Sequence, residues 1–129
     1  MKETLYIETS IVSYLTARPS RDLVIAAHQQ ITNDWWENNR VEFYLFTSQL
    51  VLDEASAGDA VAAKRRFAKL DEIPLLEISN EIIILTDELM KNHCLPAKAI
   101  EDALHISIAS VHSMNYLLTS ISLMQKCAH

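Results

Sequence analysis

Three acidic residues stand where a carboxylate is difficult to explain as ordinary surface charge. Glu8 follows the β-branched and aromatic run TLYI, Glu54 lies within LVLDEAS, and Asp102 lies in an otherwise apolar segment, beside Ile106 and Ala109. Acids brought close together raise one another's pKa unless a cation lies among them, and oxygen ligands of this kind favour Mg²⁺ or Mn²⁺. Such an ion can polarise a phosphate and generate hydroxide from water, so the three acids together would suit phosphodiester hydrolysis.

Each acid also has a simpler interpretation. Glu54 would be a solvated helix residue, and Glu8 would favour the N-terminus of a following helix. Asp102 would lie in water at the rim of the core or accept a hydrogen bond from a nearby backbone N–H. Whether the acids meet depends on the elements that carry them.

Segment 96–114 is predicted to be the helix that carries Asp102. Its apolar residues recur with the spacing of a helix that buries one face, at Ile100, Ala103, Leu104, Ile108 and Val111. At about 100° per residue, Glu101 groups with His105 and His112 on a polar flank. Asp102 lies about 100° further round, among apolar residues. The two histidines lack a third ligand at zinc spacing, and we interpret both as surface residues.

The remaining elements alternate between strands and helices. Short β-branched and aromatic runs predict strands at 4–8, 41–47, 73–78 and 115–119. Helical patterns follow at 11–17, 20–39, 49–57, 60–70 and 81–93, with Thr9 or Ser10, Ser48 and Asp59 as cap residues. This order predicts a three-layer α/β/α fold with a parallel sheet of four or five strands. Sites in such folds form at the carboxyl ends of strands, where Glu8 ends the first strand and Thr119 the last.

Composition limits the classes of protein to which the chain can belong. Its 129 residues predict one domain over residues 1–129, and a net charge of −6 gives no help to non-specific binding of nucleic acid. Cys94 and Cys127 show neither CxxC spacing nor a disulfide framework. The N-terminus lacks the apolar segment of a signal peptide, and no apolar run reaches the ~20 residues that span a membrane. We therefore expect a soluble cytoplasmic protein without a membrane partner.

Three segments carry a resemblance to a known family. LYIETSIVSYL, TSQLVLDEASAGD and LPAKAIEDALHISIASVHSMNYLLT, in this order and spacing, resemble the PIN-domain nucleases, up to about Thr119. The branch is the one that contains the toxin ribonucleases of toxin–antitoxin modules. The resemblance implies a Mg²⁺- or Mn²⁺-dependent endoribonuclease with RNA as substrate, an antitoxin protein as partner and a homodimeric assembly.

The same resemblance implies roles for individual residues. Glu8 takes the place usually held by Asp, and Glu54 and Asp102 match the next two acids, so these three would hold the metal. Ser10 and Thr119 would be supporting contacts at the catalytic site. Glu101 would then be an ordinary surface acid.

The C-terminus departs from the family pattern. The fourth polar ligand has no match at Ile121, and the hydroxyls of Ser120 and Ser122 bring no charge to a cation. The part of the fold that usually follows residue 119 is also missing from the sequence. The alternative prediction is therefore a catalytically degenerate PIN-like module that binds a protein such as an antitoxin.

Overall fold

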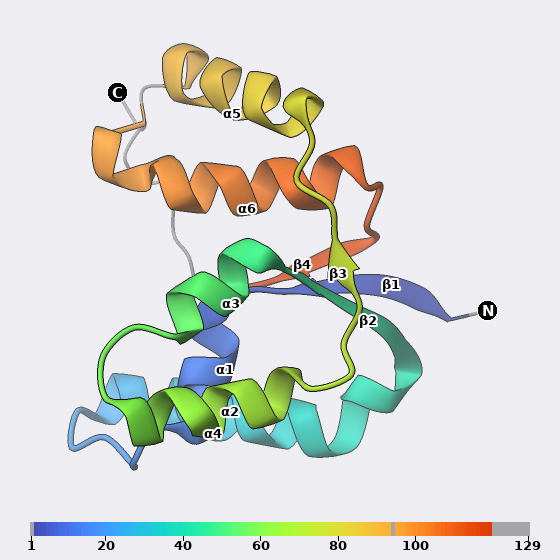
Figure 1. The fold of residues 1–129 in the computed structure, drawn as a ribbon. Helices are drawn as coiled ribbons and strands as arrows, with labels where there is room; N and C mark the ends of the chain where they lie inside the picture. Colours follow the sequence, from blue (N-terminus) through green and yellow to red (C-terminus); the bar gives the residue numbers. More distant parts are fainter. Residues whose placement is uncertain (1, 94, 120–129) are drawn as a thin grey trace.

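A parallel sheet forms the centre of the computed structural model, which describes residues 2–93 and 95–119 (Figure 1). Its four strands are β1 (Glu3–Ile7), β2 (Phe43–Ser48), β3 (Leu75–Leu76) and β4 (Tyr116–Leu118). They lie in the order β3-β2-β1-β4, and every neighbouring pair is parallel. The predicted α/β class and parallel sheet are confirmed, with four strands in the described part of the chain.

Helices cover both faces of this sheet. They are α1 (Thr9–Thr16), α2 (Leu23–Asn39), α3 (Gln49–Ala55), α4 (Ala60–Leu70), α5 (Asn80–Asn92) and α6 (Ile100–Val111), with 3₁₀ turns η1 (Arg40–Glu42) and η2 (Ala97–Ala99). In Figure 1, α6 lies between the sheet and α5, while α1, α2 and α4 lie on the opposite side. This arrangement confirms the predicted three layers. Within residues 2–93 and 95–119, no helix combines the length and the apolarity needed to cross a membrane.

Two helix starts differ from the sequence prediction. The residue that caps α1 is Glu8, whose side chain accepts a hydrogen bond from the Ser10 backbone, while Thr9 and Ser10 are already helical. Helix α2 begins later than position 20 because Asp22 caps it by accepting bonds from two backbone N–H groups. The predicted caps Ser48 and Asp59 are confirmed.

The observed ends of one strand and one helix also differ from the sequence prediction. The third predicted strand, 73–78, shortens to two residues because β3 is an edge strand that pairs with β2 alone. The last predicted helix, 96–114, opens instead with the 3₁₀ turn η2. Within the stripe predicted to be buried, Ile100 is 51 % exposed where η2 meets α6. Ala103 and Ile108 are fully buried.

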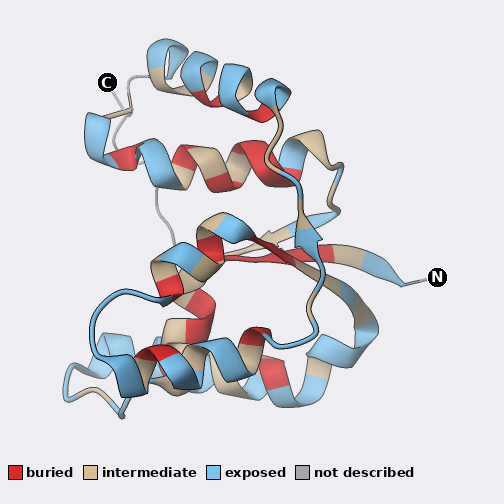
Figure 2. Ribbon diagram, viewed as in Figure 1, coloured by how far each residue is buried: buried red, intermediate tan, exposed pale blue. Residues whose placement is uncertain are grey.

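Strand β1 is the most enclosed element because it has a strand on each side and helices on both faces. Leu5 pairs with Leu45 of β2 and Tyr116 of β4, and Leu5, Tyr6 and Ile7 are buried. Figure 2 shows this burial continuing through the centre of the sheet and along α6. A polar residue at the end of β1 is therefore held by a rigid core.

Candidate metal centre

Glu8 begins the site at the carboxyl end of β1. Its backbone N–H donates to the Leu118 carbonyl at 3.3 Å, which ties the end of β1 to β4. The side chain is buried, and Oε2 accepts from the Ser10 backbone N–H at 3.0 Å. Oε1 accepts from the hydroxyls of Ser10 and, at 2.8 Å, Thr119. Two residues predicted to support the site, Ser10 and Thr119, therefore lie directly on Glu8.

Glu54 reaches the same place from α3, which follows β2. Its Oε1 accepts hydrogen bonds from the Thr9 hydroxyl and from His105 Nε2, the latter at 2.8 Å. Burial alone would raise the pKa of Glu54, but hydrogen bonds from His105, Glu101 and Thr9, together with the charge of His105, lower the pKa to about 2. The carboxylate of Glu54 is therefore held in its ionised form.

The interpretation of His105 as a surface residue is wrong. Its side chain is completely buried, although it does share a flank of α6 with Glu101 as predicted. That flank turns toward Glu54 of α3 rather than toward solvent, and His105 Nε2 lies 2.8 Å from Glu54 Oε1. The interpretation failed because helical phase gives the direction of a side chain but does not show which element lies opposite.

A buried hydrogen-bonded chain supports the inner side of His105. Its Nδ1 lies 2.7 Å from the Tyr6 hydroxyl, which lies 2.7 Å from the Ser48 hydroxyl. Burial raises the pKa of Tyr6; the hydrogen bond with Ser48 opposes this effect, while the charges of Glu54 and Glu8 add to it. Tyr6 therefore stays a neutral phenol, and His105 is bonded at both ring nitrogens.

Glu8, Glu54 and His105 form a group that can hold a metal ion. Each offers one ligand atom, and these three atoms lie within 4.8 Å of one another. Ligands about 2.1 Å from a shared ion lie up to about 4.2 Å apart, so a small adjustment would suffice. Among the described residues, no Lys or Arg forms a salt bridge with either glutamate. The donor set fits a divalent cation, but it does not by itself select Mg²⁺ or Mn²⁺.

Asp102 lies at the border of this group. It is partly buried in the first turn of α6, and its carboxylate is not among the three clustered ligand atoms. Its pKa is raised by burial and then by the negative charges of Glu8 and Glu54, with His105 opposing them. Asp102 is thus close enough to interact electrostatically with both glutamates, and its role as a third acidic ligand stays a prediction.

Glu101 has a larger part in the cluster than a surface acid would. Its side chain is exposed, as expected, but it lines an open hollow together with Glu8, Glu54 and residues of α1 and α3. Its pKa is raised because protonated Glu101 hydrogen-bonds to Glu54 and because the Glu54 charge repels its ionised form. The two carboxyl groups therefore tend to hold one proton between them, because two ionised carboxylates this close would repel each other.

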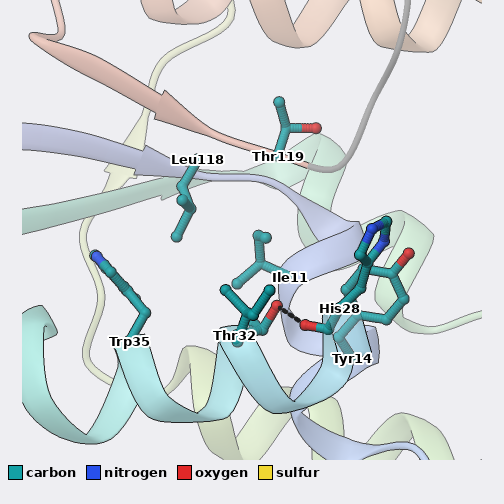
Figure 3. A pocket seen from close by; sticks show the side chains of 8 residues that line it. Ile11, Tyr14, His28, Thr32, Trp35, Leu118 and Thr119 are labelled. Atoms are coloured by element: carbon teal, nitrogen blue, oxygen red, sulfur yellow. Dashed lines mark hydrogen bonds between the residues drawn. The ribbon is translucent and has the colours of Figure 1, made fainter. Parts of the chain in front are cut away.

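An apolar pocket lies on the other side of Thr119. About 270 Å³ in volume, it is lined by Ile11, Tyr14, His28, Ile31, Thr32, Trp35, Leu118 and Thr119. Figure 3 shows Ile11, Thr32 and Leu118 pointing into the space between α1, α2 and the end of β4. Thr119 thus contacts Glu8 and also lines this pocket.

Sequence reasoning missed Thr9, Tyr6 and His105 as parts of the site. Thr9 adjoins two residues that were named, and Tyr6 is two positions before Glu8 on β1, so alternation along the strand was the available signal. Positions Ser120, Ile121 and Ser122, where a fourth ligand was sought, lie outside the described residues.

Comparisons with known proteins leave the family open. No protein-family model matches the chain, and no curated protein or solved structure matches it. The resemblance to PIN-domain nucleases therefore depends on the three sequence segments alone.

Proposed function

We propose that the chain is a divalent-metal-dependent endoribonuclease of the PIN-domain type, acting in the cytoplasm as the toxin of a toxin–antitoxin module. RNA would be its substrate, Mg²⁺ or Mn²⁺ its cofactor, and an antitoxin protein its partner. Glu8, Glu54 and Asp102 would hold the ion. A homodimer is part of this proposal because the resembling family has that assembly.

One observation carries the proposal. The ligand atoms of Glu8, Glu54 and His105 lie within 4.8 Å of one another, although Glu8 follows β1 while Glu54 and His105 belong to α3 and α6. Burying several acids beside one another is unfavourable unless a cation or a proton compensates their charge. Their position near the carboxyl ends of parallel strands supports the proposal, because sites in such folds form there.

The protein's own residues would keep this site in order. Ser10 and Thr119 fix both the position and the orientation of Glu8, and Thr9 fixes Glu54. When bound, a divalent cation polarises a phosphate oxygen and lowers the pKa of water. The cation would also reduce the repulsion between the acids and the RNA backbone, which the net charge of −6 otherwise increases.

Cleavage of single-stranded RNA at increasing Mg²⁺ or Mn²⁺ concentration tests the proposal. We expect cleavage that depends on the cation and falls at least about a hundredfold in Glu8→Gln and Asp102→Asn, because each removes a charged ligand. The cation should also raise the melting temperature of the wild type through preferential binding to the folded state. Both measurements use the same protein samples.

Asp87→Asn provides the matched control, since it removes an exposed acid from α5, away from the site. Its cleavage and its cation-dependent shift should equal those of the wild type. A wild type with neither cleavage nor a cation-dependent shift would contradict the proposal.

A second candidate is a PIN-like module that binds protein without catalysis. The observation that favours it is the exposure of apolar residues on α2, where Leu23 is 85 %, Val24 65 % and Ile31 66 % exposed. Exposed apolar residues mark interaction surfaces where they form a contiguous patch. Replacing Leu23 and Ile31 by Ser should abolish capture of an antitoxin if this candidate holds, whereas Glu8→Gln should leave capture unchanged.

A further inference from the structure

The buried imidazole of His105 connects the sheet to the candidate metal centre. We propose that His105 is a positioning residue that holds the Glu54 carboxylate in the orientation required for binding a divalent cation, and that it is not itself a ligand. This inference depends on the proposed metal-dependent function and gives one residue of that site a role that the sequence did not suggest.

The hydrogen bonds of His105 give it a single orientation. Nε2 lies 2.8 Å from Glu54 Oε1, and Nδ1 lies 2.7 Å from the Tyr6 hydroxyl. Tyr6 in turn lies 2.7 Å from the Ser48 hydroxyl. Tyr6, Ser48 and His105 are all fully buried, so water does not compete for these bonds.

The direction of the hydrogen bonds follows from their partners. A carboxylate only accepts, so Nε2 must carry the hydrogen that it donates to Glu54. If the ring is neutral, Nδ1 accepts from the Tyr6 hydroxyl, and the Tyr6 oxygen accepts from Ser48. Every buried donor in this chain is then satisfied, which is consistent with the lack of unpaired buried side-chain polar atoms in the described part of the chain.

Direct ligation by His105 would disrupt this arrangement. A cation at Nε2 would replace the hydrogen that now binds Glu54, and it would have to reach a ring with no exposed surface. The hydrogen bonds from Thr9 and His105 both go to Oε1 of Glu54, so neither of them occupies Oε2. A set of carboxylate oxygens suits Mg²⁺ as well as Mn²⁺.

Groups that orient metal ligands affect affinity even though they do not touch the ion. Removing such a partner typically weakens metal binding about 10- to 100-fold. We expect that range for His105→Leu and about tenfold for Tyr6→Phe, which keeps the ring of His105 but releases it from its anchor. His105→Gln should bind more tightly than His105→Leu, since its amide N–H can donate to Glu54.

Calorimetric titration of the full chain with Mg²⁺ alone is the decisive measurement. Ser107→Ala is the matched control, because it removes a fully buried hydroxyl two residues away on α6 whose partners are Thr86 and the Ala103 carbonyl. Its affinity should equal that of the wild type. If Tyr6→Phe and His105→Leu both bind Mg²⁺ as tightly as the wild type does, the inference is overturned while the proposed function stays intact.

Electron paramagnetic resonance of bound Mn²⁺ distinguishes a positioning residue from a metal ligand. Protein labelled with ¹⁵N-histidine should show no nitrogen coupling to bound Mn²⁺ if His105 acts through Glu54. A coupling that disappears in His105→Gln would establish His105 as a ligand and overturn the inference. A wild type that binds neither ion would contradict the proposed function and the inference together, so the two failures are distinguishable.

Discussion

Two clusters of buried polar side chains lie within α6 and its neighbours, and they differ in charge and in access to solvent. Around His105, the side chains include the acids Glu8 and Glu54 and border an open hollow. Two residues further along α6, Ser107 forms a neutral pair at 2.9 Å with Thr86 of α5, and both side chains are buried.

The difference shows how to separate a candidate site from a packing contact. The Thr86 and Ser107 hydroxyls each also donate to a backbone carbonyl four residues earlier in their own helix, and they carry no charge that would require a cation. The acids near His105 have precise hydrogen-bond partners but no Lys or Arg in a salt bridge among the described residues. Satisfied neutral groups specify packing, whereas clustered acids that no Lys or Arg neutralises suggest a site for a cation.

The largest expected difference between the clusters is in stability. His105→Leu should lower the free energy of unfolding by about 3 kcal/mol, because the buried Tyr6 hydroxyl and the Glu54 carboxylate both lose a partner. Ser107→Ala should lower it by about 1 kcal/mol, since Thr86 still donates to the Ile82 carbonyl. Urea denaturation without divalent cations gives both values.

Equal losses in the two variants would remove the distinction between the clusters. A change in the denaturant slope would indicate that a variant alters the compactness of one state, so both slopes have to match that of the wild type.

The second and smaller expected difference between the clusters is in how folding stability depends on pH. The pKa of Glu54 is lowered from 4.5 to about 2, so the folded state holds its ionised form more strongly than the unfolded chain does. The resulting stability is complete above pH 4.5 and is lost as pH falls toward about 2. Because Glu54 keeps some access to solvent, we expect about 1–2 kcal/mol rather than the full value of the shift.

Glu54→Gln isolates this contribution, because an amide does not titrate. The variant should be less stable than the wild type at neutral pH, and the two should converge in acid. A difference that stays constant over the whole range would show that the Glu54 charge does not contribute to folding. Ser107→Ala, which changes no charge, should follow the wild-type pH profile throughout.

Much of the fold could be predicted because local patterns and tertiary neighbours agree. The helix over Ala60–Leu70 was predicted to the residue, since Asp59 caps it and an amphipathic pattern fills it. The parallel sheet followed from strands that alternate with helices. Ile100 shows the limit: its spacing matches the buried stripe, but it lies where η2 meets α6 and remains half exposed.

The candidate site could be predicted only where a residue stands at the end of an element. Glu8 and Thr119 were named because strand ends meet at one edge of a parallel sheet, whereas Ser10 was named from the resemblance to a known family; the structure brings all three together. His105 was misinterpreted because its partners, Tyr6 and Glu54, lie 99 and 51 residues away in sequence. A single sequence without such distances gives no sign that an exposed-looking histidine is enclosed.

The smallest expected effect concerns Glu101, the exposed member of the charged cluster. Its pKa is raised by the hydrogen bond to Glu54 and by the Glu54 charge, so the folded state disfavours its ionised form. The stability that its proton contributes is therefore present in acid and lost as pH rises through the raised pKa. Glu101→Gln keeps a hydrogen-bond donor for Glu54 and removes the repulsion between the two carboxylates. The variant should therefore be more stable than the wild type at neutral pH, by a few tenths of a kcal/mol. The value is small because water screens exposed charges. Thermal unfolding of Glu101→Gln and of Glu88→Gln, which changes an exposed acid on α5, measures the difference with the same loss of net charge in both variants. If Glu101→Gln is no more stable than Glu88→Gln, or is less stable than the wild type, the shared proton does not couple the two acids and the charged cluster ends at Glu54.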